Sequence, residues 1–182
     1  AVLMPLHAAA VGFFGVYYKL QNFLYMPLYG MTNTLVPIIG YNLGAGKPNR
    51  IRRLAWQAVK FSLVLMGAGM VLFLLFPRAL LGLFGSEAFA YSGGLAAIRI
   101  IAPSFLPAGV ILTFAGMLQG LGRSGEALLL SSLRQIIFLL PVAYLLGQHN
   151  LSVLWIAFPV AELLSLPASL WLWRRAAKAL QK

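Results

Sequence analysis

The chain has 182 residues, of which 61% are hydrophobic and 9% are charged, and its mean hydropathy is +0.87. Soluble domains carry about a quarter charged residues and about half apolar residues. A domain of this length leaves much of its surface exposed, so the apolar excess cannot all be buried inside it. The composition therefore excludes a water-soluble globule.

The formal charge is +11, from 14 basic and three acidic residues. The basic residues form short clusters between long apolar segments, a pattern typical of loops beside a membrane rather than of a nucleic-acid-binding surface. The chain has no cysteine, which excludes a disulfide framework, a thiolate metal site and a cysteine nucleophile. No histidine cluster or acidic pair has metal-ligand spacing. We therefore expect neither a nucleic-acid partner nor an enzyme, and no cofactor or metal.

A helix of about 20 apolar residues crosses a bilayer. Five segments of the sequence meet this requirement: 11–43, 54–76, 94–118, 127–147 and 151–173. Prolines interrupt the first and third of them: Pro27, Pro37, Pro103 and Pro107. Because proline removes a helical hydrogen bond, we expect kinks or breaks there, which are candidate hinges. The predicted fold class is all-α, a polytopic bundle of five transmembrane helices.

The distribution of positive charge predicts how these helices are oriented. With five crossings, ten basic residues fall on one side: Lys47, Arg50, Arg52, Arg53, Lys60, Arg123, Arg174, Arg175, Lys178 and Lys182. The connections on the opposite side, residues 1–10, 77–93 and 148–150, contain one basic residue, Arg78. Because positive loops remain in the cytoplasm, we expect a multi-pass protein of the cell membrane with a cytoplasmic C-terminus. Segment 47–60 resembles a short amphipathic helix whose charges either set the topology or bind anionic lipid.

Charged residues also occur inside the expected spans: Lys19, Arg99, Arg134 and Glu162. A charge at bilayer depth costs about 2.5–3.5 kcal/mol, so it normally faces a partner or a wet cavity. Counted along their helices, Lys19 and Glu162 lie at similar depths and would meet if their spans adjoin. Arg99 is expected nearer the outer face and Arg134 nearer the cytoplasmic face. These residues form either a functional charge network or buried pairs that fix helix packing.

Several stretches, in this order, resemble the multidrug and toxic compound extrusion family: FGVYYKLQNF at 14–23, VPIIGYNLGAGKP at 36–48, LAAIRIIAPS at 95–104, QGLGRSG at 119–125 and WIAFPVAE at 155–162. Members of that family have twelve helices in two lobes, and this chain resembles the second lobe without its first helix. The resemblance implies an antiporter that exports organic cations or drugs in exchange for protons or sodium ions. It also implies an N-terminal lobe as partner, with alternating access between the lobes.

The family's main ion-coupling aspartate lies on the first helix of the first lobe, outside this chain. We therefore expect no ion coupling by this segment alone, in which Glu162 is the only carboxylate at membrane depth. Candidates for the substrate cavity are polar, aromatic or flexible apolar residues: Gln21, Asn22, Asn33, Tyr41, Phe105, Met117 and Gln119. Each of them is also compatible with plain helix packing.

Two alternatives stay open at the level of sequence. A lipid-linked glycan flippase of related fold would suit the positive interior better than a cationic drug does. A non-transporting membrane scaffold, or the degenerate product of a truncated gene, would need no cavity at all.

Overall fold

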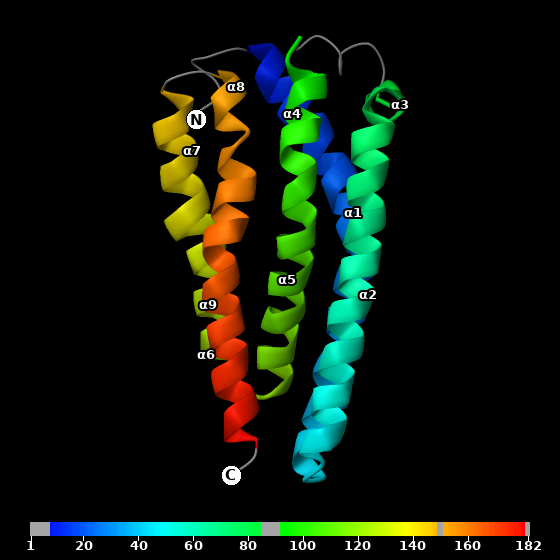
Figure 1. Ribbon diagram of the computed structural model, residues 1–182, viewed down its shortest axis with the longest axis vertical. Coiled ribbons are helices and arrows are strands. Elements are labelled where there is room, and N and C mark those ends of the chain that lie inside the picture. Colours follow the sequence, from blue (N-terminus) through cyan, green and yellow to red (C-terminus); the bar gives the residue numbers. More distant parts are fainter. Residues whose placement is uncertain (1–7, 85–91, 149–150, 181–182) are drawn as a thin grey trace.

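The apolar segments of the sequence form long helices that run side by side in one elongated bundle (Figure 1). The structure is a computed structural model and describes residues 8–84, 92–148 and 151–180. Every element in these ranges is helical, which confirms the all-α fold class. Lys182, one of the basic residues expected in the cytoplasm, lies outside the described residues.

The helices in chain order are α1 (Ala8–Gly44), α2 (Pro48–Leu75), α3 (Pro77–Gly82), α4 (Gly94–Ile101), α5 (Phe105–Gly120), α6 (Ser124–Ser132), α7 (Leu140–Gly147), α8 (Leu151–Leu154) and α9 (Ala157–Ala179). A 3₁₀ turn, Ala102–Ser104, joins α4 to α5, and a π-helical segment, Leu133–Leu139, joins α6 to α7. Three helical stretches are long and apolar enough to cross a membrane: Pro48–Leu75, Gly94–Gly120 and Ser124–Gly147. Crossing by α1 and α9, and the exact boundaries of all five spans, stay predictions.

The expected proline effects differ between the first and the third segment. α1 continues through Pro27 and Pro37 without a break. In the third segment, Pro103 lies in the 3₁₀ turn, where the chain changes helix type, and Pro107 lies in the first turn of α5. Because Pro107 has no N–H, it cannot donate the usual helical bond to the carbonyl of Pro103. The hinge role of all four prolines stays a prediction.

α5 lies in the middle of the bundle and packs against α1, α2 and α9 (Figure 1). Most of its residues are buried, and they contribute to both hydrophobic clusters of the core. Small residues permit this close approach. A Cβ on Gly116 would lie 3.0 Å from Thr32 Cβ, and one on Gly109 would lie 2.6 Å from Met66 Cγ. Gly116 and Gly120, which are four residues apart, thus mark close helix contacts, whereas Gly44, four residues after Gly40, has no atom within 4 Å of its Cβ position.

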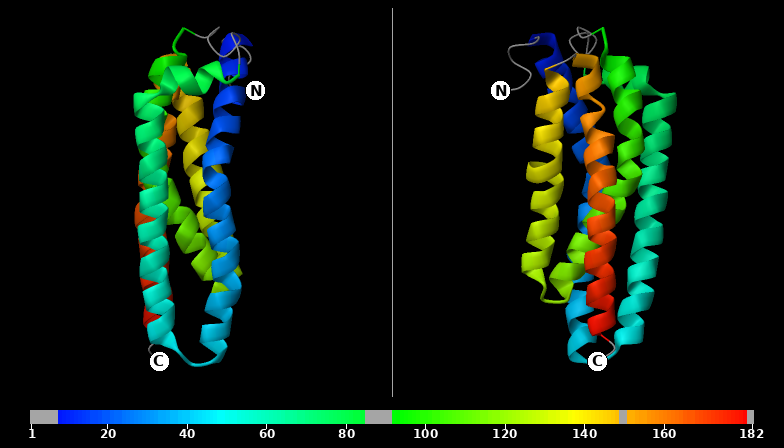
Figure 2. Two further views of the ribbon diagram at one scale, coloured as in Figure 1. Left: turned by 90° about the vertical axis from the view of Figure 1, so that its right-hand side faces the viewer. Right: turned by 60° about the vertical axis from the view of Figure 1, so that its left-hand side comes forward.

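The basic residues gather at one end of the bundle. The turns that follow α1 and α5 and the end of α9 lie toward this end, which we call the basic end, whereas α3 and α8 lie at the other (Figure 2). Arg78, on α3, is at that other end. This arrangement is the one that the positive-inside argument requires. The compartment that the basic end faces stays a prediction.

Two chain reversals at the basic end have the same backbone hydrogen bonds. Gly46 and Gly122 each adopt a positive φ, 63° and 73°. The corresponding bonds run from Gly46 N to Leu43 O and from Lys47 N to Asn42 O, and from Gly122 N to Gln119 O and from Arg123 N to Leu118 O. This pairing is the Schellman motif, which ends a helix on a left-handed glycine. The next helix then begins on the Lys47 or Arg123 carbonyl.

Replacement of Gly120 by alanine tests the packing of α5. The added Cβ would lie 2.9 Å from Ile39 Cβ and 3.0 Å from the Val36 carbonyl oxygen, so we expect a loss of about 1–3 kcal/mol by overpacking. Gly44→Ala is the matched control, because nothing lies within 4 Å of its Cβ position. The midpoint of thermal unfolding in detergent measures the difference. Equal midpoints for the two variants would contradict the packing described.

Candidate functional site

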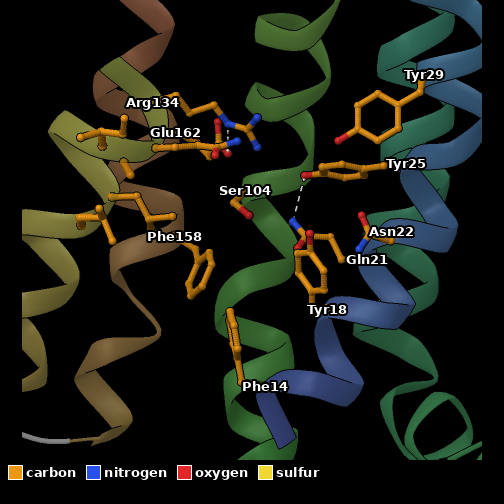
Figure 3. Close-up of a pocket in the computed structure, with 15 residues that line it drawn as sticks. Phe14, Tyr18, Gln21, Asn22, Tyr25, Tyr29, Ser104, Arg134, Phe158 and Glu162 are labelled. Atoms are coloured by element: carbon orange, nitrogen blue, oxygen red, sulfur yellow. Dashed lines mark hydrogen bonds and ion pairs between the residues drawn. The ribbon is translucent and has the colours of Figure 1, made fainter. Parts of the chain in front are cut away.

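A buried ion pair joins the π-helical segment to α9 in the middle of the bundle. Arg134 Nε donates a hydrogen bond to Glu162 Oε1 at 2.7 Å (Figure 3). The two side chains are only 12% and 10% exposed. At bilayer depth, neither charge is stable without a partner. The pair therefore neutralises both residues and holds the last two helical stretches together.

The local sequence explains the π-helical segment that carries Arg134. Pro141 lies in the first turn of α7 and has no N–H, so it cannot donate the usual bond to the carbonyl of Ile137. The turns just before this point widen into the π-helix. Such segments occur frequently at functional sites, because they change the direction of side chains relative to a regular α-helix.

Glu162 keeps one oxygen available. Ser165 and Ser169 lie on the same buried face of α9, but their hydroxyls donate to carbonyls of α9 itself, each at 2.7 Å. Glu162 Oε2 is buried and has no hydrogen-bond partner among the described residues. Buried carboxylate oxygens are nearly always satisfied in proteins. This oxygen therefore keeps unused capacity to accept a hydrogen bond.

A cavity of about 350 Å³ opens beside the ion pair, between α1 on one side and the π-helical segment and α9 on the other (Figure 3). We call it the central cavity. Its lining residues are Phe14, Tyr18, Gln21, Asn22, Tyr25, Tyr29, Ser104, Arg134, Gln135, Ile136, Leu139, Leu140, Phe158, Ala161 and Glu162. Aromatic and apolar surface with a few polar groups is the composition of small-molecule sites.

One face of α1 supplies an aromatic wall to the central cavity. Phe14, Tyr18, Tyr25 and Tyr29 recur at helical spacing and all line it. The Gln21 amide donates to the Tyr25 hydroxyl at 3.3 Å, which fixes both side chains. This periodic aromatic stripe was the signal in the sequence that could have located the cavity, and sequence reasoning missed it.

The structure brings together only part of the expected charge network. Arg134, and not Lys19, is the partner of Glu162. Lys19 is exposed, with Nζ 5.9 Å from the ring centroid of Phe84, and Arg99 is exposed on α4. The expectation that Lys19 meets Glu162 came from depth along the helices alone. It fails because Lys19 points away from the face of α1 that lines the central cavity.

The seven expected cavity residues divide into two that line the central cavity, Gln21 and Asn22, and five that do not. Asn33, Tyr41 and Gln119 are exposed elsewhere on the bundle. Phe105 and Met117 have no exposed surface, because they pack in the two hydrophobic clusters. In this structure, those two residues therefore act in helix packing.

The fold and the central cavity define a helical membrane protein with an internal site. Residues 1–145 match the family model described as MatE, and the chain belongs to the MatE family. As expected from the sequence, it is similar to transporters of that family.

Individual relatives match nearly the whole chain, one in sequence and two in fold. An FAD transporter of Shewanella oneidensis is 27% identical over 166 residues, which are 90% of this chain and 36% of the relative. The solved structure of the MATE multidrug transporter DinF-BH is 34% identical with a TM-score of 0.80, covering 89% of this chain and 36% of that one. The solved structure of an outward-facing multidrug resistance MATE family transporter is 17% identical with a TM-score of 0.91, and the match covers 99% of this chain and 41% of that one. The chain thus spans about two fifths or less of these proteins.

Removal of one partner from the buried ion pair should be far more harmful than removal of both. We expect Arg134→Met to cost about 3–5 kcal/mol, because it leaves the Glu162 carboxylate buried and uncompensated. The double variant Arg134→Met with Glu162→Leu should recover most of this loss. Thermal unfolding midpoints of the four proteins of this double-mutant cycle give the coupling. Additive effects would show that the two charges do not stabilise each other.

Proposed function

We propose that this chain is the C-terminal lobe of a secondary active antiporter that exports organic cations or drugs in exchange for protons or sodium ions. The carrying observation is the central cavity, in which an aromatic wall on α1 faces a buried carboxylate that has one oxygen without a hydrogen-bond partner among the described residues. Membership of the MatE family supports the proposal, as does the similarity to multidrug transporters. Alternating access would come from movement against an N-terminal lobe outside this chain.

The chemistry of the central cavity suits a flat organic cation. Aromatic faces attract cations by about 0.5–2 kcal/mol, more strongly where water is excluded. Tyr18 and Tyr29 are partly exposed to the cavity and are free to contact a ligand. At the opposite wall, the negative charge of Glu162 is balanced by Arg134. A cation or proton that binds there competes with Arg134 for the carboxylate, and this competition links occupancy of the cavity to the contact between the π-helical segment and α9.

The proposal places the protein in the cell membrane, surrounded by lipid, with its basic end and C-terminus in the cytoplasm. It requires no cofactor beyond the coupling ion, proton or sodium. The main coupling carboxylate is expected in the N-terminal lobe. Glu162 then acts as the carboxylate that the C-terminal lobe contributes to the cavity.

A second candidate is transport of an anion. Arg134 lines the central cavity beside Glu162, and one relative is named as an FAD transporter. A substrate with a phosphate group would displace Glu162 from Arg134, and a lipid-linked glycan carried by a flippase has such a group. A scaffold protein, the remaining alternative, would show no transport dependent on an ion gradient.

Glu162→Gln in the full-length transporter tests the cation proposal. The amide keeps the shape of the side chain but removes its charge, so we expect efflux of a cationic dye from cells to fall by about tenfold. Glu126→Gln is the matched control, because Glu126 pairs with Arg123 at the basic end, outside the cavity. Unchanged efflux in Glu162→Gln would refute the role of this residue. Unchanged efflux after collapse of both the proton and sodium gradients would refute antiport.

The aromatic wall makes a separate prediction about affinity. Tyr18→Leu should weaken binding of an aromatic cation by about 0.5–2 kcal/mol, whereas Tyr18→Phe should retain it, since the ring face makes the contact. Tyr41→Leu is the control, because Tyr41 is 72% exposed and lies away from the central cavity. Fluorescence titration of a dye against the purified transporter measures the dissociation constants. Equal weakening by the Tyr18 and Tyr41 variants would exclude the wall as the binding surface.

A further inference from the structure

A second groove lies near the basic end, with α2 and α9 as its walls and α5 as its floor. Figure 1 shows α2 and α9 on either side of α5. Its volume is about 370 Å³, and it shares no lining residue with the central cavity. We call it the lateral groove. It is lined by Arg52, Ala55, Trp56, Val59, Val110, Phe114, Leu170, Trp173, Arg174 and Ala177.

The two walls of the lateral groove have the same construction. α2 contributes four residues with spacing i, i+3, i+4 and i+7, beginning at Arg52, and α9 contributes four with the same spacing, beginning at Leu170. Residues at this spacing share one face of a helix. Each face carries one arginine and one tryptophan among small or aliphatic residues. Stacking of the Trp173 and Phe114 rings, with centroids 5.6 Å apart and planes at 12°, fixes the α9 wall against the floor.

The chemistry of the lateral groove changes along its length. On α2, which begins at the basic end, Arg52 is the lining residue nearest that end, and Trp56 lies one turn further in. On α9, which ends there, Ala177 lies nearest, and Arg174 with the adjacent Trp173 lies about one turn further in. Val59 and Leu170 lie farthest in. From Arg52 to Val59 the helix rises about 10 Å. The groove thus combines a mouth that carries both arginines and both tryptophans with an apolar inner end.

The cationic mouth has no carboxylate to neutralise it in the part of the chain that the structure describes. Of the three acidic residues of the sequence, Glu126 pairs with Arg123 and Glu162 with Arg134. The third, Glu87, lies outside the described residues. Arg52 and Arg174 are both exposed at the mouth. An occupant with negative charge at one end complements them.

We propose that the lateral groove binds an anionic phospholipid. The phosphate lies between the Arg52 and Arg174 guanidinium groups, which bind phosphate oxygens through paired N–H donors. The Trp56 and Trp173 rings lie at the level of the glycerol, where indoles are favoured at membrane interfaces. One acyl chain follows the groove inward to Val59, Val110 and Leu170.

The occupant is a lipid rather than a soluble anion, because most of the groove is apolar and would gain nothing from a free phosphate. One wall belongs to Pro48–Leu75, which is long and apolar enough to cross a membrane. A lipid therefore enters the groove sideways from the bilayer. An anionic head group is preferred over a zwitterionic one, because the two arginines repel a choline ammonium group. The bound lipid would join α2 to α9 across α5.

Native mass spectrometry and thermal unfolding of the purified full-length transporter test this proposal. We expect phosphatidylglycerol to form retained adducts and to raise the unfolding midpoint. Phosphatidylcholine with the same acyl chains should do neither. The double variant Arg52→Gln with Arg174→Gln should bind phosphatidylglycerol about tenfold more weakly, because it removes both basic contacts to the anionic head group.

The matched control is Arg53→Gln with Arg175→Gln, which removes the same charge from the same helices outside the lateral groove. Its lipid binding should stay at the wild-type level. Equal losses of phosphatidylglycerol binding in both double variants would mean that general surface charge causes the binding, which would refute the lateral groove as the site. Equal stabilisation by soluble glycerol phosphate would assign the arginines to a free phosphate ester and overturn the lipid. Neither measurement depends on transport, so the result is independent of the proposed function.

Discussion

The close approach of α5 to α1 and α2 is the constraint on which the remaining structure depends. In a bilayer, lipid is as apolar as the helix surface, so helices associate through tight packing rather than through the hydrophobic effect. Gly109 and Gly116 supply that packing by removing side chains where Met66 and Thr32 approach. With α5 held in the centre, Ser104 reaches the central cavity on one side and Phe114 forms the floor of the lateral groove on another.

Much of the fold could be predicted from the sequence because its signals are local. Apolar length predicts each helical stretch, and the spacing of Gly116 and Gly120 predicts a helix contact without knowledge of the partner. The clustering of basic residues at one end likewise follows from their positions between apolar segments. Pro27 shows the limit of such signals, because a proline permits a kink without requiring a break. Neighbouring helices decide between these outcomes, and no local pattern records them.

The candidate site was harder to predict, because it depends on how helices rotate about their own axes. Depth along a helix placed Lys19 near Glu162, but depth does not give the direction of a side chain. The partner turned out to be Arg134, which a π-helical segment before Pro141 presents to α9. A sequence pattern based on a regular helical period misplaces residues in such a segment. The aromatic stripe on α1 was visible in the sequence, yet only the assembled bundle shows that it faces a cavity.

The two matching chain reversals differ in one electrostatic respect. In the reversal after α5, Glu126 pairs with Arg123. In the reversal after α1, the equivalent position is Arg50, which carries the same charge as Lys47. The same backbone motif thus occurs once with an internal ion pair and once with only positive side chains. The reversal with only positive side chains is followed by α2, which carries Arg52 at the mouth of the lateral groove. The same backbone geometry therefore has different electrostatic consequences at the two reversals. The Arg123 reversal carries its own counter-charge, whereas the positive charge of the Lys47 reversal is balanced by anions outside it.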